Sequence, residues 1–253
     1  MSFLQRCAVR FGRAAQQKPL VSLCVPVYGT EGLIGQFLDS VLAQKDAPLF
    51  ETIVVNDGSP GTKELGRIIK TYAKRFKMQG LPFVFLEHRK NLGLVEARRT
   101  AVNAASGEYL AFADSDDELP PAALRILYDA ACASGADIVH GKAAVFGTEG
   151  EPEARIETFA QKAAHVYFGT LTGDAIMHGF LIEHLYSDFL WGKLFKTSLV
   201  QKAFAEIPFT YCTMAEDVLT FFFIALHAGT YIGIPETVYN YRINTGVTSR
   251  KEI

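Results

Sequence analysis

The stretch Tyr109-Leu-Ala-Phe-Ala113, followed at once by Asp114-Ser-Asp-Asp117, decides the fold of this chain. The apolar run is typical of a buried strand, and the acids begin where that strand should end. Pro120 and Pro121 come next and suit the first turn of a helix, so the acids lie on a strand-to-helix loop. Open α/β sheets bind ligands at such loops, which makes residues 114–117 a candidate site.

The charge of this loop has two interpretations. Three carboxylates within four residues repel one another unless something compensates them. Mg²⁺ or Mn²⁺ would do so, because these cations prefer hard oxygen ligands and bridge carboxylates to phosphates. The alternative is a solvated acidic turn that caps a helix N-terminus. Taken alone, the cluster fits both interpretations about equally well.

Composition limits the classes of function. The chain has 253 residues, of which 49% are hydrophobic, and a net charge of −2. It can therefore bury a full core, and it has no bulk attraction to nucleic acid, so no nucleic-acid partner is expected. Its four cysteines are far apart and form no CxxC pair, as expected for reduced thiols in a cytoplasmic protein. No apolar run reaches the roughly 18 residues of a membrane-spanning helix.

Residues 1–19 form a basic, amphipathic extension in which all charged side chains are positive. Such a segment can lie as an interfacial helix on anionic lipid, which would put the protein at the cytoplasmic face of a membrane by peripheral contact. An ordinary appended helix or an unstructured terminus is the alternative. The apolar residues that recur at helical spacing are Phe3, Leu4, Cys7, Phe11 and Ala14.

The first half of the chain alternates apolar runs with helical patterns, which indicates βαβ units and a mainly parallel sheet. Thr30 is expected to be the N-cap of the first helix. A Gly/Glu/Pro-rich loop at 147–153 leads into a less regular second half, and the whole is expected to be one unit. Strands are predicted at 20–27, 52–55, 83–86, 109–113 and 137–140, and helices at 33–42, 63–77, 94–105 and 124–133.

Acidic residues occur at two further places. Asp57 follows the second predicted strand in the turn Asn56-Asp-Gly-Ser59, where it either accepts from a base N–H or a ribose hydroxyl, or simply forms a turn. Glu216-Asp217 precede an apolar helix. One interpretation is that their negative charge stabilises the helix through its dipole. The other is that one of them is a general base, because a neighbouring hydrophobic wall raises the pKa of a carboxyl group.

Taken together, these motifs make the chain resemble the family 2 glycosyltransferases, inverting enzymes with the GT-A fold. The resemblance covers about residues 20–249 and implies a single GT-A-type α/β unit, with a Rossmann-like, mostly parallel (mixed) central sheet flanked by helices. The motifs that carry it are Val21-Ser-Leu-Cys-Val-Pro-Val-Tyr28, Ile53-Val-Val-Asn-Asp-Gly-Ser59, Asn91-Leu-Gly-Leu94, Ala97-Arg98, Ala105-Ser-Gly-Glu-Tyr109, Asp114-Ser-Asp-Asp117, Leu190-Trp-Gly-Lys-Leu-Phe195, Glu216-Asp217 and Tyr239-Asn-Tyr-Arg242.

The resemblance also implies roles for the two halves of the unit. Residues 20–142 would bind the nucleotide sugar, and residues 143–253 would form the acceptor side. The base and ribose would be held by Pro26, Val27, Tyr28 and Asp57, and by Asp114 with Ser115 beside it. Asp116 would bind the metal on the diphosphate, Asp117 would support or face the donor sugar, Arg98 would brace the acids, and Arg242 would meet phosphate or acceptor. Asp217 would be the catalytic base, with Glu216 orienting it or the acceptor.

The implied reaction moves a sugar, expected to be UDP-linked, to an acceptor hydroxyl with inversion. A divalent cation, Mn²⁺ or Mg²⁺, would stabilise the departing diphosphate, as a carboxylate deprotonates the acceptor. The acceptor would be a glycan or a lipid-linked glycan of the cell surface. A nucleotidyltransferase is one rival, although Gly29-Thr-Glu-Gly32 lacks the basic residues of its phosphate loop. The other rival is an inactive nucleotide-sugar-binding module, which the joint presence of Asp57, Asp116 and Asp217 disfavours.

A few positions depart from the family pattern. Many members have a metal- or phosphate-ligating His two residues after the Tyr-Arg pair, where this chain has Asn244. The cation is therefore expected to arrive with the donor. Arg99 and Ala101 replace a common Asn and Gly and are expected to change only packing or surface. The six histidines show no metal-ligand spacing, and Trp191 is interpreted as core rather than as a sugar platform.

Overall fold

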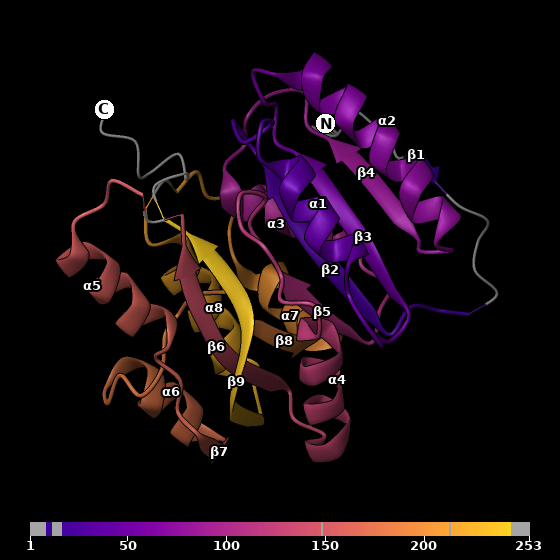
Figure 1. The fold of residues 1–253 in the computed structure, drawn as a ribbon. Coiled ribbons are helices and arrows are strands. Elements are labelled where there is room, and N and C mark those ends of the chain that lie inside the picture. Colours follow the sequence, from indigo (N-terminus) through magenta and orange to yellow (C-terminus); the bar gives the residue numbers. More distant parts are fainter. Residues whose placement is uncertain (1–8, 12–16, 148, 213, 244–253) are drawn as a thin grey trace.

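The computed structural model describes residues 9–11, 17–147, 149–212 and 214–243, whose nine strands form one mixed sheet (Figure 1). The strands are β1 (Val9–Phe11), β2 (Val21–Val27), β3 (Phe50–Asn56), β4 (Phe83–Glu87), β5 (Tyr109–Phe112), β6 (Ile138–Phe146), β7 (Gly169–Thr172), β8 (Lys193–Lys196) and β9 (Thr230–Arg242). Their order is β1-β4-β3-β2-β5-β8-β6-β9-β7. The predicted mixed α/β fold is therefore confirmed.

Helices cover both faces of this sheet. They are α1 (Ile34–Leu42), α2 (Thr62–Met78), α3 (Leu94–Ala104), α4 (Ala123–Ser134), α5 (Glu153–Ala163), α6 (Asp174–Leu181), α7 (Thr197–Glu206) and α8 (Glu216–His227). Helices α1, α2 and α4 pack on the face that takes Leu23 and Val25 of β2, and α3, α6, α7 and α8 pack on the face that takes Cys24. Since both faces are covered, the central strands β2 and β3 are buried along their whole length and are mostly apolar.

The first half of the sheet sets the edge where a ligand can bind. Strands β4, β3, β2 and β5 are parallel neighbours, whereas β8 pairs antiparallel with both β5 and β6. Because parallel strands end at one edge, the loops after β2, β3 and β5 come together there. The five strands and four helices predicted for residues 20–142 are confirmed, although β6 continues to Phe146, well beyond the predicted end at residue 140.

Two local expectations are wrong. Residues 9–11, which the pattern placed in a helix, form β1 and pair antiparallel with β4, because the free edge of β4 offers backbone partners; residues 1–8 and 12–16 lie outside the described part. Thr30 does not cap α1 with its side chain: the N-cap is Leu33, with no side-chain cap bond. The Thr30 hydroxyl instead lies 2.6 Å from the Ser115 hydroxyl, so its hydrogen-bond partner is in the acidic loop and not at the helix N-terminus.

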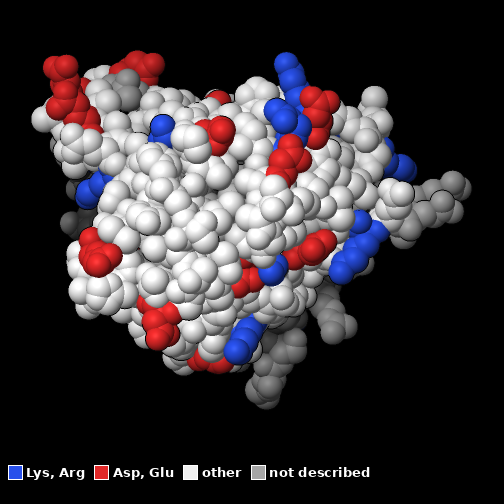
Figure 2. All heavy atoms as spheres, turned by 90° about the horizontal axis from the view of Figure 1, so that it is seen from below, with Lys and Arg blue, Asp and Glu red and all other residues white. Residues whose placement is uncertain are grey.

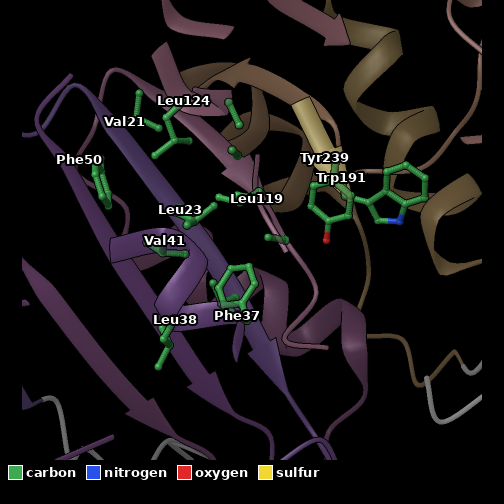
Figure 3. Packing of buried hydrophobic residues seen from close by; sticks show 14 of the residues in the cluster. Val21, Leu23, Phe37, Leu38, Val41, Phe50, Leu119, Leu124, Trp191 and Tyr239 are labelled. Carbon is green, nitrogen blue, oxygen red and sulfur yellow. The ribbon is translucent and has the colours of Figure 1, made fainter. Parts of the chain in front are cut away.

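The core reaches the edge where the site lies. Figure 3 shows Trp191 and Tyr239 in the same hydrophobic cluster as Phe37 of α1 and Leu23 of β2. The face seen in Figure 2 carries acidic and basic side chains interspersed around a largely uncharged surface, with no extended basic patch on that face. Among the described helices, none has both the length and the apolar character required to cross a membrane.

Candidate active site

A cavity of about 350 Å³ opens at the carboxyl edge of the parallel strands, a size typical of ligand sites. It brings together residues from both halves of the chain. Nine of the predicted site residues line it: Pro26, Val27, Tyr28, Asp57, Asp114, Ser115, Asp116, Glu216 and Asp217. Arg98, Asp117 and Arg242 are not among its lining residues and lie behind it, where they hold the lining residues in place.

One end of the cavity is built around Asp57, whose carboxylate is almost fully buried. Its Oδ1 accepts from the backbone N–H of Leu92 at 2.9 Å and lies 2.6 Å from Nδ1 of His88. Its Oδ2 accepts from the N–H of Gly93 at 2.9 Å. The other ring nitrogen of His88 lies 2.8 Å from the Thr100 hydroxyl, so the imidazole is fixed from both sides. Asp57 thus ties the turn after β3 to the loop that begins α3.

These two loops approach so closely that only glycine fits at position 58. Gly58 has a φ of +69°, and a Cβ there would lie 2.5 Å from the carbonyl carbon of Lys90. The turn Asn56-Asp-Gly-Ser59 is therefore more than a solvent-exposed turn, because its geometry sets where Asp57 meets the 88–93 loop. Asn91 and Gly93 of that loop also line the cavity.

The acidic loop after β5 is held by the last strand of the sheet. The Tyr239 hydroxyl accepts from the backbone N–H of Asp114 at 2.9 Å and donates to Oδ2 of Asp117 at 2.7 Å. The backbone N–H of Arg242 donates to Oδ1 of Asp117 at 2.7 Å, and its Nε donates to the carbonyl oxygen of Asp116 at 2.8 Å. Asp117 therefore supports the loop from below, and its position relative to a donor sugar stays a prediction.

The guanidinium of Arg242 is used within the protein. Its Nη2 donates to Gln36 at 2.7 Å and to Glu118 at 3.1 Å, and it lies over the ring of Phe146. The predicted contact of Arg242 with phosphate or acceptor has no direct geometric support here, and the side chain instead connects β9 to the acidic loop and to α1.

Arg98 links the acidic loop to the start of α8. It is buried, donates through Nη1 to Oδ1 of Asp217, and lies 3.5 Å from Oδ1 of Asp114 through Nη2. Burial lowers the pKa of Arg98, but Asp217 and Asp114 more than reverse this and keep the group charged. The bracing role predicted for Arg98 matches this geometry.

More negative charge gathers here than Arg98 can neutralise. Burial raises the pKa of Asp114 to about 7 against the opposing charge of Arg98, and Asp116 adds to the rise. The Asp114 side chain is nevertheless 30% exposed through the cavity, so a ligand can reach it. Burial also raises the pKa of Glu216, with a further contribution from Asp217. The site is thus suited to a ligand that brings positive charge or hydrogen-bond donors.

The backbone before α8 holds the two acids in place. Ala215, the N-cap residue, has a φ of +59°, which is rare for a residue with a side chain and is typical of constrained functional sites. Glu216 and Asp217 then occupy the first turn of α8, where the helix dipole favours negative charge. Asp217 is 17% exposed and faces the cavity, with Oδ2 unbonded within the described residues.

An aromatic wall closes the cavity beside these acids, and the sequence did not assign it to the site. Trp191 stacks on Phe189 at 4.4 Å, on Tyr239 at 5.0 Å and on Tyr241 at 5.4 Å between ring centroids. Trp191 is a core residue, as expected, but it lines the cavity as well. The Leu190-Trp-Gly-Lys motif also provides Lys193, whose buried ammonium donates to the carbonyl of Ser187 at 3.0 Å and so anchors the segment before Phe189.

The sequence assigned His88 no role, yet its ring lies 2.6 Å from the Asp57 carboxylate. Its position directly after β4, at the same edge as the other strand ends, is the signal that could have identified it. Tyr211, Cys212, Tyr241 and Thr30 also line the cavity without having been predicted. They lie within or a few residues from the quoted motifs, and this proximity is the signal that could have identified them.

A divalent cation has partial support from the residues present. Within the described part of the chain, no group of three or more His, Cys, Asp or Glu side chains is placed to hold a metal ion on its own. Mg²⁺ is commonly bound through only one or two carboxylates together with substrate phosphates, however. Asp116 and Asp114, which line the cavity together, fit a site of that kind. Asn244 lies outside the described residues.

Comparison with known proteins agrees with this geometry. Residues 22–215, well over half of the chain, match the family model described as "Glycosyl transferase family 2". The chain therefore belongs to glycosyltransferase family 2. It is 29% identical over 244 residues to "Glycosyltransferase GlyA" of Streptococcus pneumoniae, covering 91% of this chain but 31% of GlyA. It thus spans only about a third of that relative.

Two solved structures share the fold. Staphylococcus aureus TarS 1–349 in complex with UDP-GlcNAc superposes with a TM-score of 0.68 at 23% identity, covering 92% of this chain and 61% of that one. Mannosyltransferase PcManGT from Pyrobaculum calidifontis, in complex with GDP-Man and Mn²⁺, gives 0.60 at 20% identity, covering 92% and 59%. At such identities the similarity establishes the GT-A fold, as the sequence predicted.

Proposed function

We propose that this protein is an inverting glycosyltransferase that moves a sugar from a nucleotide-diphosphate sugar to an acceptor hydroxyl. The observation that carries this proposal is one cavity that is lined both by Asp57, which follows β3, and by Asp114, Asp116 and Asp217, which come from the loop after β5 and the start of α8. An inactive binding module would not need a second cluster of charged carboxylates, and that cluster costs stability when no ligand compensates it.

In this proposal Asp57 reads the nucleobase. A carboxylate has about four lone-pair sites, and the protein occupies three of them, two on Oδ1 and one on Oδ2. A base N–H can therefore donate to Oδ2, with Pro26, Val27 and Tyr28 forming the adjacent wall. The bound UDP-GlcNAc of TarS supports a UDP-linked donor, and the GDP-Man of PcManGT makes a guanosine donor the competing outcome.

Asp116, with Asp114 beside it, would hold Mg²⁺ or Mn²⁺ against the diphosphate, as the Mn²⁺ complex of PcManGT supports. When bound, the cation would stabilise the negative charge that grows on the departing diphosphate. Asp114 and Ser115 would also contact the ribose. Arg242 and Asp117 keep this loop in place rather than touching the reacting atoms.

Asp217 acts as the general base. Arg98 fixes its Oδ1, which leaves Oδ2 to take the proton from the acceptor hydroxyl. The acceptor oxygen then forms the new glycosidic bond as the bond from the anomeric carbon to the diphosphate breaks, and the centre inverts. Glu216 orients the acceptor. Residues 20–142 form the donor side and residues 143–253 form the acceptor side. The acceptor is a glycan or a lipid-linked glycan, and peripheral contact of the protein with the membrane gives access to it.

The test is a panel of UDP- and GDP-sugars with Mn²⁺ or Mg²⁺, read by nucleotide release and thermal shift. Asp217→Asn is expected to slow transfer about 10²- to 10⁴-fold, because a positioned base contributes that much. It should bind the nucleotide diphosphate as the unmodified protein does. Asp174→Asn is the matched control, since Asp174 lies in the first turn of another helix and is exposed. If no nucleotide diphosphate stabilises the protein and Asp217→Asn changes nothing, the proposal is wrong.

A further inference from the structure

Two tyrosines on one strand make opposite use of their hydroxyl groups. Tyr239 and Tyr241 lie two residues apart on β9, and both stack on Trp191. The Tyr239 hydroxyl forms hydrogen bonds within the protein, to the backbone N–H of Asp114 and to the carboxylate of Asp117. Within the described residues, the Tyr241 hydroxyl has no hydrogen-bond partner, although Tyr241 lines the cavity and is only partly exposed.

The ring of Tyr241 is held in place at the lining of the cavity. Its ring stacks on Trp191 with an interplanar angle of 24° and on Phe159 of α5 with an angle of 19°, so the ring cannot turn freely. Burial raises the pKa of Tyr241, and the charges of Asp117 and Asp114 add to the rise, so the hydroxyl keeps its proton and lies within the field of the acidic loop. A fixed donor near those carboxylates suits a neutral, oxygen-rich group.

The indole N–H of Trp191 is a second donor of the same kind. Trp191 lines the cavity, and its N–H has no hydrogen-bond partner within the described residues. Its nitrogen is not fully buried, so a ligand can reach it. An aromatic wall with donors at its edge is chemically matched to a sugar ring. The hydroxyl oxygens of a sugar accept the hydrogen bonds that such donors offer.

We infer that Tyr241 Oη and Trp191 Nε1 form a subsite that recognises the hydroxyl groups of a sugar ring and so determines sugar specificity. This inference rests on the proposed function, because it places the sugar at the acid end of the cavity, beside Asp217. The sugar is either the donor sugar carried by the nucleotide or the sugar of the acceptor. Loss of the Tyr241 hydroxyl would weaken binding of the donor in the first case and of the acceptor in the second.

The test removes one oxygen atom. Tyr241→Phe keeps the ring and its stacking, so the fold and the binding of UDP with Mg²⁺ should be unchanged. Affinity for the UDP-sugar that binds best, chosen from UDP-glucose, UDP-galactose and UDP-N-acetylglucosamine, should fall about 3- to 10-fold, as expected for one lost hydrogen bond. Titration calorimetry with UDP and with the UDP-sugar gives the ratio directly.

Tyr239→Phe is the matched control, because it removes the same atom from a hydroxyl that serves the protein. It should lower the melting temperature and weaken UDP and UDP-sugar by a similar factor. If Tyr241→Phe leaves donor binding unchanged but raises the KM for a saccharide acceptor in the transfer assay, the subsite belongs to the acceptor sugar.

The inference is overturned if Tyr241→Phe changes neither donor affinity nor acceptor KM, or if it weakens UDP and UDP-sugar equally. In both cases UDP binding by the unmodified protein leaves the proposed function intact. If the unmodified protein binds no nucleotide diphosphate at all, the proposed function fails and the subsite fails with it.

Discussion

The two ends of the cavity compensate their carboxylates differently. Asp57 receives two backbone N–H groups and faces the imidazole of His88, all from loops next to it in the sheet. At the other end, Asp114 and Asp217 share the guanidinium of Arg98, and their supports come from β5, α3 and α8. One carboxylate is satisfied by two backbone N–H groups and an imidazole, and the other two by a single buried guanidinium.

This difference separates recognition from chemistry. A carboxylate whose lone pairs are mostly occupied is a fixed acceptor, suited to reading the edge of a base. Carboxylates that outnumber their counter-charge remain responsive to what binds, and burial is what raises the pKa of Asp114 to about 7. The acid end therefore gains most from a ligand that carries a cation, and it should be the end most sensitive to loss of charge.

Removing the shared cation should have the largest effect on stability. Arg98→Met would strand Asp114 and Asp217 without their buried partner, and we expect the free energy of unfolding to fall by about 3–5 kcal/mol. Urea unfolding measures this change. In the double variant Arg98→Met/Asp217→Asn one stranded charge is gone, so about 1–3 kcal/mol should be recovered. Strictly additive losses would contradict the shared-cation description.

At the Asp57 end, we expect stability to depend on the close approach of the Gly58 backbone to the 88–93 loop rather than on charge. Gly58→Ala adds a Cβ 2.5 Å from backbone of Lys90 at a positive φ, so we expect a loss of about 2–5 kcal/mol and weaker nucleotide binding. Gly135→Ala is the matched control, because Gly135 has a φ of +67° but open space around its Cβ position. It should cost only about 1 kcal/mol and leave binding unchanged. Equal losses in thermal unfolding would show that contact with the 88–93 loop is unimportant.

The same contrast explains what could be predicted from the sequence. The strands of the first half are mostly apolar runs that end in polar residues, and a parallel sheet brings those ends to one edge. Asp57 and the 114–117 acids are therefore locatable from local pattern alone. Their pairing with Glu216-Asp217 required the resemblance to a family, because nothing local shows that α8 reaches the same edge.

The parts that could not be predicted depend on contacts between distant segments. The hydrogen bonds of Tyr239 and Arg242 to Asp117 join residues more than 120 positions apart, and the motif Tyr239-Asn-Tyr-Arg242 does not by itself show that its partner is the acidic loop. β1 was mistaken for helix because three residues carry too little periodicity, and the free edge of β4 decided its conformation.

The most specific expected effect is a change in proton binding at the acid end. In the folded protein Asp114 keeps its proton up to about pH 7, whereas in the unfolded chain its pKa is about 3.9. Its contribution to stability is therefore complete below about pH 4 and is lost as the pH rises through about 7. Asp114→Asn should flatten that part of the dependence of melting temperature on pH.

Proton release on ligand binding is a second measurement of the protonation of Asp114. Because UDP with Mg²⁺ favours the charged carboxylate, binding at pH 6.5 should release protons, measurable by calorimetry in buffers of different ionisation enthalpy. Asp114→Asn should abolish most of this release. Asp117→Asn is the control: burial also raises the pKa of Asp117, but that side chain is occupied by Tyr239 and Arg242 and does not line the cavity. Asp117→Asn should therefore alter the pH dependence of stability and leave the proton release on binding in place. An undiminished proton release in Asp114→Asn would show that Asp114 is not the group that loses its proton and would contradict its contact with the ligand.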